Sequence, residues 1–242
     1  MTKRAFIDRE SALAGQGYLS PGETRHLCKV LRARAGDEIE LLDGVGGRFA
    51  GRIAAIDRDE CEVEILGELP AGRRPPYKLT MGVSFPDRKR TSTMVRMLSE
   101  LGVQGLFHLV AERSEWDVEA AKKQAERLED IARESCKQCG RAVPMQLSPP
   151  KTFNEITNEI GFRRSVFPMI ASTRETRLRV ADRMQIRPDE QEKVLALVGP
   201  VGDFTDAEYD KAAELGFLSV TLGTYILRVE TAAAAIAAQT LI

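Results

Sequence analysis

The hydrophobic pattern changes character about a third of the way along the chain. Before residue 67, short stretches of alternating apolar and polar residues are separated by turns, which is typical of half-buried strands. We predict strands over 38–43, 48–56 and 61–66, with a hairpin loop at 44–47. One helix is expected to begin at Pro21, because Ser20 suits the N-cap and Glu23 stands three residues later. Short strands joined by turns favour a small barrel.

From Tyr77 onward, predicted buried strands alternate with amphipathic helices. The strands are expected at 78–84, 106–111, 165–171, 193–198 and 217–222. The helices are expected at 91–101, 117–138, 151–160, 205–215 and 230–241, and a capping box of Thr205 with Glu208 opens the fourth. This alternation predicts an α/β domain whose mostly parallel sheet is covered by helices on both faces.

A segment rich in proline and glycine separates the two patterns. Residues 68–76 contain Pro70, Gly72, Pro75 and Pro76. Such a segment is typically extended and solvated, so we place a domain boundary there and predict domains at 1–70 and 71–242. The length of 242 residues is compatible with one or two domains.

The formal charge is balanced over the whole chain but uneven along it. The net charge is −1, whereas nucleic-acid binders are often strongly basic. Residues 73–90 nevertheless carry six basic side chains and one acidic, a local net charge of +5. The basic residues are Arg73, Arg74, Lys78, Arg88, Lys89 and Arg90. This run is either a solvated linker or a phosphate-binding patch at a domain junction.

Membrane segments and metal sites are not expected. No apolar run approaches the ~20 residues of a membrane span, and the N-terminus lacks the apolar core of a secretory signal, so we expect a cytoplasmic protein. Cys136 and Cys139 have the spacing of half a zinc site, but no second pair of ligands accompanies them. They are predicted to be ordinary reduced thiols.

Two glycine-containing segments each follow a predicted buried strand. Residues 199–204 read Gly-Pro-Val-Gly-Asp-Phe, and residues 221–228 read Thr-Leu-Gly-Thr-Tyr-Ile-Leu-Arg. In open α/β sheets, ligands bind beyond the carboxyl ends of the strands, and glycine lets the backbone approach them closely. Taken alone, either segment is better explained as an ordinary turn between a strand and a helix. The dinucleotide, P-loop and nucleophile-elbow motifs are absent.

These segments resemble the signature of the bacterial 16S rRNA (uracil-N3) methyltransferases of the SPOUT superfamily. The most specific part is Ile-Leu-Arg at 226–228 followed by Glu-Thr-Ala at 230–232. Residues 26–32, 100–103, 112–114 and 138–144 match in order and spacing. The resemblance covers nearly the whole chain.

The resemblance implies a PUA-like barrel followed by a SPOUT α/β domain whose C-terminal segment forms a trefoil knot. It further implies a homodimer that uses S-adenosylmethionine to methylate N3 of a uridine in the 16S rRNA of the small ribosomal subunit, without a metal. The implied cofactor cradle comprises Ile170, Ala171, Gly199, Pro200, Gly202, Leu222, Gly223, Ile226, Leu227 and Arg228.

Arg228 and Arg141 are the candidates for stabilising negative charge on the uracil carbonyls during transfer. Glu230 either orients Arg228 or is a helix-start carboxylate favoured by the helix dipole. The barrel and the basic junction are expected to bind the RNA backbone. The barrel residues proposed for this role are Arg25, Lys29 and Arg32, in addition to the six basic residues of the junction.

The chain departs from the family pattern at several positions. Val201 and Asp203 stand where the family usually has Glu and Gly, and Tyr225 stands where a basic residue is usual. Lys137 replaces a usual Glu; Asp87 and Met97 replace usual lysines. Two alternatives therefore stay open: a SPOUT methyltransferase with another RNA target, and a divergent RNA-binding protein without catalytic activity.

Overall fold

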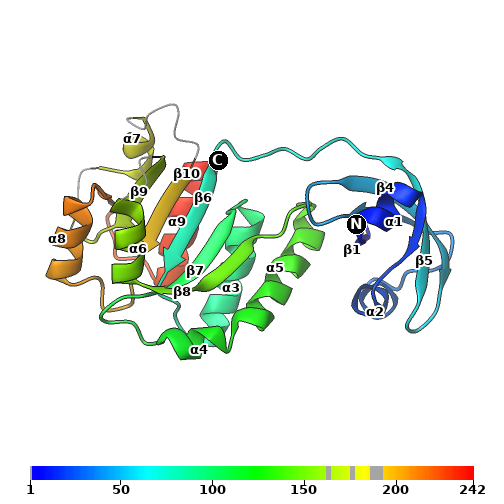
Figure 1. The fold of residues 1–242 in the computed structure, drawn as a ribbon, viewed down its shortest axis with the longest axis horizontal. Helices are drawn as coiled ribbons and strands as arrows, with labels where there is room; N and C mark the ends of the chain where they lie inside the picture. Colours follow the sequence, from blue (N-terminus) through cyan, green and yellow to red (C-terminus); the bar gives the residue numbers. More distant parts are fainter. Residues whose placement is uncertain (1, 162–164, 175–177, 186–192) are drawn as a thin grey trace. The chain divides into compact units, whose positions relative to one another are not determined.

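The computed structural model describes residues 2–161, 165–174, 178–185 and 193–242 (Figure 1). The chain divides into two compact units. One comprises the residues up to Arg73 together with Arg133–Pro144, and the other comprises Arg74–Ala132 with Met145–Ile242. The N-terminal unit therefore includes a short segment from the middle of the sequence, which contributes to its core.

The N-terminal unit is built around a mixed sheet with the strand order β1-β3-β4-β5-β2. Its elements are β1 (Arg4–Phe6), α1 (Arg9–Ala14), β2 (Gln16–Tyr18), α2 (Pro21–Lys29), β3 (Glu38–Leu42), β4 (Arg48–Ile56) and β5 (Cys61–Glu68). β1 pairs with β3 in parallel, and the other pairs are antiparallel. Alternate residues such as Leu41, Ile53 and Val63 are fully buried in one apolar cluster.

The structure confirms the helix start and the hairpin predicted for this unit. The Ser20 side chain caps α2 by accepting a hydrogen bond from the Glu23 backbone N–H. The predicted hairpin joins β3 to β4, and Gly44 and Gly46 adopt the positive φ angles that its turn requires. The short elements β1, α1 and β2 were not predicted individually, because three to six residues carry too little periodicity.

The larger unit contains a fully parallel sheet with the order β11-β9-β10-β6-β7-β8. Its strands are β6 (Lys78–Val83), β7 (Gly105–Val110), β8 (Gln146–Thr152), β9 (Val166–Ala171), β10 (Lys193–Val198) and β11 (Leu218–Val220). Its helices are α3 (Arg88–Glu100), α4 (Val118–Lys122), α5 (Ala125–Cys139), α6 (Phe153–Gly161), α7 (Val180–Gln185), α8 (Asp206–Glu214) and α9 (Val229–Leu241). The C-terminal part of α5, from Arg133, is assigned to the N-terminal unit.

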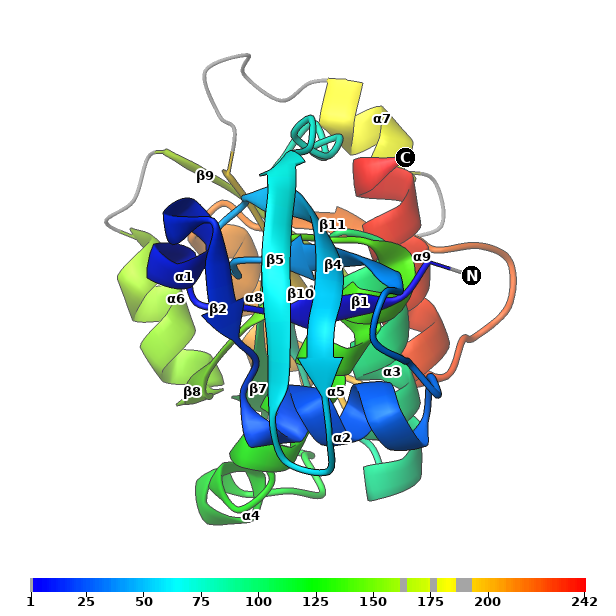
Figure 2. The ribbon, with the colours of Figure 1, turned by 90° about the vertical axis from the view of Figure 1, so that its right-hand side faces the viewer.

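Helices cover both faces of this sheet, as predicted (Figure 2). Along β10, Val194, Ala196 and Val198 point into a core shared with α3 and α9. Leu195 and Leu197 point into a second core, which also contains side chains from α6 and α8. Burial on both faces explains why β10 is a continuous apolar run in the sequence.

Two predicted features of this unit were wrong. The single helix expected over 117–138 is divided into α4 and α5, although no glycine or proline marks the break. β8 was missed because Pro149 and Pro150 argue against a strand. They are tolerated there because β8 lies at the edge of the sheet and pairs only with β7.

Candidate functional site

The three segments predicted to hold the cofactor follow three neighbouring strands. β9 lies between β10 and β11 in the sheet, and all three run in parallel. Ile170 on β9 pairs with Leu197 on one side and with Ser219 on the other. Their carboxyl ends therefore lie at the same end of the sheet, so the segments after Ala171, Val198 and Val220 begin side by side.

The segment after β10 is a tight turn. The Asp203 backbone N–H donates to the Pro200 carbonyl at 2.9 Å. A Cβ at Gly199 would lie 3.0 Å from the buried Phe204 ring, so this position favours glycine. The carbonyl of Gly202 accepts a hydrogen bond from Arg113 Nη1 at 2.7 Å. The turn is therefore held by the Phe204 ring, which packs against Gly199, and by Arg113, which binds the Gly202 carbonyl.

The segment after β11 leaves space at its glycine. Gly223 has a φ of +141°, and a Cβ added there would meet no heavy atom within 4 Å. Leu222 and Leu227 pack partly against the core, whereas Tyr225 and Ile226 are more than four-fifths exposed. The backbone between the partly buried Leu222 and Leu227 is therefore open to a ligand.

Arg228 and Glu230 lie at the start of α9 but do not pair with each other. Arg228 is the N-cap of α9, is exposed, and makes no side-chain capping bond. Among the described residues, no ion pair joins it to Glu230. One Glu230 carboxylate oxygen is buried without a hydrogen-bond partner. The Arg90 pKa is raised chiefly by its hydrogen bond to Asp87, and the charge of Glu230 adds to the effect, so this carboxylate lies near α3.

Arg141 belongs to the N-terminal unit, where it follows α5. Burial lowers the pKa of its guanidinium, and nearby Cys136 and Cys139 partly oppose this shift. Arg25, Lys29 and Arg32 are in the same unit, on α2 or just after it, and all three are exposed. Arg25 Nε donates to the Pro21 carbonyl one helical turn earlier.

The basic run at 73–90 does not form one patch. Lys78 begins β6, whereas Arg88, Lys89 and Arg90 follow its other end at the start of α3. A strand of six residues separates the two groups by roughly 20 Å. The second group lies on the sheet edge that carries the glycine segments, and its Arg90 is paired with Asp87 at 2.5 Å. Arg73 and Arg74 are exposed where the two compact units meet in the sequence.

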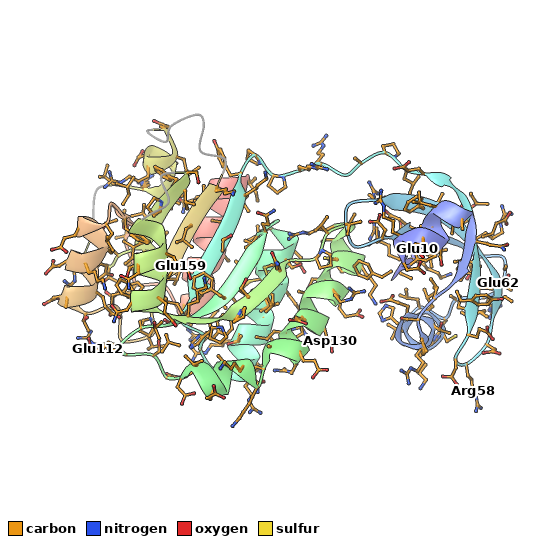
Figure 3. All side chains as sticks on the ribbon, in the orientation of Figure 1. Glu10, Arg58, Glu62, Glu112, Asp130 and Glu159 are labelled. Carbon is orange, nitrogen blue, oxygen red and sulfur yellow. The ribbon has the colours of Figure 1, made fainter. Side chains whose placement is uncertain are left out.

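Several residues at this edge were missed by sequence reasoning. Arg113 lay within a matching motif, but nothing indicated its contact with Gly202. Asp203 was noted only as a departure from the family pattern, yet its carboxylate accepts hydrogen bonds from Thr173 and Tyr209. The loop after β7 also contacts α8, because the Glu112 backbone N–H donates to Glu208 Oε1 at 2.9 Å. The side chain of Glu112 is labelled in Figure 3.

His108 on β7 has a structural role. Its Nδ1 accepts from the Phe85 backbone N–H at 2.9 Å, so its Nε2 carries the proton and donates to the Trp116 carbonyl at 3.0 Å. Burial lowers the pKa of this imidazole and keeps it neutral. An apolar hollow of about 330 Å³ lies beside it, between β7, β8, α4 and α5. This hollow contains none of the residues of the glycine segments.

Lys137, one of the departures, is occupied in a buried ion pair within the N-terminal unit. Its Nζ lies 3.1 Å from Glu23 Oε2 on α2 and 2.6 Å from Glu134 Oε1. The Lys137 side chain is only 5% exposed, and that of Glu23 is 11% exposed. Lys137 therefore fastens α2 to the C-terminal part of α5.

Removing this lysine is expected to destabilise the protein. Lys137→Ala leaves Glu23 buried without its partner, which costs about 3 kcal/mol. Lys122→Ala, which removes an exposed pair with Glu119, is the matched control and should cost less than about 1 kcal/mol. Urea denaturation measures both variants. Equal free energies of unfolding in the two variants would mean that the buried ion pair stabilises the protein no more than the exposed one.

Within the described ranges, no helix is long and apolar enough to cross a membrane. The same residues contain no group of three or more histidine, cysteine or acidic side chains placed to hold a metal ion. The four cysteines are free thiols.

Comparison with known proteins identifies the larger unit. Residues 73–241 match the model of the RNA methyltransferase domain. The chain belongs to this family. Residues 19–66 match the model of the RNA methyltransferase PUA domain. The family predicted from the glycine segments is thereby confirmed, as are the PUA-like first region and the α/β methyltransferase fold.

Several relatives of this RNA methyltransferase span almost its whole length. A ribosomal RNA small subunit methyltransferase E from Aquifex aeolicus is 29% identical over 90% of each chain. Its counterpart from Synechocystis is 24% identical over 99% of this chain and 77% of its own. The crystal structure of a ribosomal RNA small subunit methyltransferase E from Neisseria gonorrhoeae, bound to S-adenosylmethionine, is 26% identical. It superposes with a TM-score of 0.87 over 98% of this chain and 96% of its own.

A protein from Legionella pneumophila, also solved with S-adenosylmethionine, is 26% identical. It superposes with a TM-score of 0.85 over 99% of this chain and 96% of its own.

Proposed function

We propose that this protein transfers a methyl group from S-adenosylmethionine to N3 of a uridine in 16S rRNA of the small ribosomal subunit. The observation that carries the proposal is the convergence of the segments after β9, β10 and β11 on one sheet edge. Support comes from the family, from relatives named as small subunit rRNA methyltransferases, and from two similar structures solved with this cofactor. The proposal includes a cytoplasmic homodimer with a knotted C-terminal segment.

The described residues fit such a cofactor. The open space above Gly223 admits a ligand against the backbone, where a side chain would fill it. The turn at Gly199–Gly202 and the end of β9 at Ala171 lie at the same end of the sheet as Gly223, and the partly buried Leu222 and Leu227 flank that glycine. An adenine ring is bound by amide hydrogen bonds and apolar packing rather than by charge, so this cradle is appropriate to it.

When bound, S-adenosylmethionine supplies a methyl carbon already activated by its sulfonium. In the overall step a carbon–nitrogen bond forms at N3, the sulfur–carbon bond breaks and the N3 proton leaves. The role of the chain is to align the uridine, which by itself accounts for a large part of catalysis. Arg228 is exposed at the edge of the cradle, where its charge offsets negative charge on the uracil carbonyl oxygens. Arg141 stays the second candidate for this task, and Glu230 is a carboxylate in the first turn of α9, where the helix dipole favours negative charge.

A methyl-transfer assay tests this function. Small ribosomal subunits from a strain lacking the gene are incubated with the protein and isotopically labelled S-adenosylmethionine, and the modified nucleotide is then mapped. We expect label on N3 of a uridine in 16S rRNA. Label on another RNA would favour a different target. Absence of both label and cofactor binding in calorimetry would favour a non-catalytic RNA-binding protein.

Reversing the charge of Arg73, Arg74 and Lys78 to glutamate is expected to weaken RNA binding. Each lost phosphate contact lowers the slope of log K against log salt by about 0.7–0.9, so three contacts lower it by roughly 2–3. A triple reversal at Arg96, Lys122 and Lys123, which are exposed and outside the proposed RNA-binding residues, is the control for net charge. Titrations of RNA with both variants at several salt concentrations measure the slope of log K against log salt. Equal slopes in the two variants would mean that residues 73–78 are only a solvated linker.

A further inference from the structure

Asp203 adopts a backbone conformation that is unusual for its residue type. Its φ is +61°, in the left-handed region where residues with a Cβ are disfavoured, although Asp and Asn tolerate it better than most. The family usually has glycine at this position, which would adopt the same conformation without strain. A strained residue at a binding segment persists only when its surroundings hold it in place.

Three donors hold the Asp203 carboxylate. Oδ1 accepts from the Phe204 backbone N–H at 2.8 Å and from Tyr209 Oη at 2.7 Å. Oδ2 accepts from Thr173 Oγ1 at 2.6 Å. Thr173 follows β9, Tyr209 lies on α8, and Asp203 lies in the segment after β10. One side chain thus connects two of the segments that form the proposed cofactor cradle.

The surroundings of Tyr209 hold its ring in place and keep the hydroxyl proton that it donates to Asp203. Its ring packs edge-on against Phe204 with a centroid distance of 5.5 Å, and the Arg174 guanidinium lies 4.7 Å over its other face. Its Oη also lies 3.2 Å from the Ala171 carbonyl oxygen, on the strand end that is assigned to the cradle. Burial raises the pKa of the Tyr209 hydroxyl, and Asp203 adds to the shift, so the hydroxyl keeps its proton at neutral pH.

We infer that Asp203 is a positioning residue that ties the segment after β9 to the segment after β10 before the cofactor binds. The inference rests on the proposed function, because it assigns both segments to one cofactor site. Holding the two segments in the bound arrangement removes an ordering cost from binding. The strain of the left-handed aspartate is offset by the three hydrogen bonds, two of which reach residues outside its own turn.

Two substitutions remove the tie while keeping the shape of the side chains. Asp203→Asn tolerates the left-handed conformation but replaces one acceptor oxygen with an N–H donor, which faces Thr173 or Tyr209. Tyr209→Phe keeps the ring against Phe204 and removes the hydroxyl. Asp210→Asn, on the exposed side of α8, is the matched control for the loss of a carboxylate.

Calorimetry with S-adenosylmethionine and amide hydrogen exchange of the cofactor-free protein test the inference. Each single variant is expected to bind the cofactor about tenfold more weakly, because the loosened segments must then be ordered when the cofactor binds. The double variant should lose less affinity than the sum of the two single losses, because both substitutions remove the bond between Asp203 and Tyr209. Exchange should become faster at 171–174 and at 199–204 than in the wild type, and Asp210→Asn should behave like the wild type.

Unchanged affinity together with unchanged exchange in Asp203→Asn would overturn the inference, as would fully additive effects in the double variant. If the wild type itself showed no heat with S-adenosylmethionine, the proposed function would fail. The exchange rates would then still decide whether Asp203 ties the two segments.

Discussion

Arg228→Ala is expected to lower kcat/KM for methyl transfer by about 10²–10³-fold, the usual loss when one stabilising group is removed from a developing oxyanion. The variant should fold normally. Arg228 is exposed and makes no capping bond with its side chain, so truncating it removes no buried contact. Single-turnover methylation of small ribosomal subunits measures the rate, and thermal unfolding measures the stability.

Arg96→Ala provides the matched control for this prediction, because Arg96 is an exposed arginine on α3 away from the three cradle segments. It should retain both rate and stability. Cofactor affinity in Arg228→Ala should fall less than the rate, since the proposed task of the guanidinium is to offset charge on the uracil. A variant with normal turnover would remove Arg228 from the mechanism.

The arrangement of the proposed site was predictable because parallel strands share an edge. Two glycine segments were each placed after a buried strand by periodicity alone, and a parallel sheet brings such segments to the same side. What periodicity does not contain is the order of strands. β11 pairs with β9, although β10 and α8 intervene in the sequence. That the two glycine segments follow the strands on either side of β9 was therefore an implication of the family resemblance, and the structure supplies the geometry.

The errors arise where tertiary context overrides local signals. The prolines of β8 are harmless only at a sheet edge, which a sequence does not reveal. The six basic residues at 73–90 were treated as one surface, yet the buried strand β6 lies within that run and separates its ends. Basic residues that are close in the sequence are therefore not always close in space.

The departures from the family pattern gain physical explanations at two positions. Lys137 is charge-compensated by Glu23, a residue 114 positions earlier, so no local pattern could have indicated the pair. Asp203 is held by Thr173, 30 positions earlier, and by Tyr209, six positions later. Both departures are accommodated by specific partners, and for Asp203 this argues against random decay of the proposed site.

Gly223→Val is expected to weaken binding of S-adenosylmethionine by about 100-fold or more. Two effects combine at this position. A β-branched residue at a φ of +141° is strained by roughly 1–3 kcal/mol, and relaxing that strain moves the segment between Leu222 and Leu227. The added side chain also enters the open space above Gly223, which the proposed cofactor needs. Since each 1.4 kcal/mol is a factor of ten in affinity, the sum accounts for the expected loss.

Gly216→Val separates these two effects. Gly216 ends α8 with a φ of +81°, and a Cβ there also meets nothing within 4 Å, so valine introduces backbone strain at a place outside the cradle. Both variants should lose melting temperature, but only Gly223→Val should lose cofactor affinity in calorimetry. Equal affinities in the two variants would mean that the segment after β11 does not contact the cofactor, and the three-segment cradle would have to be abandoned. A selective loss would place the ligand against this backbone, because strain alone is common to both substitutions.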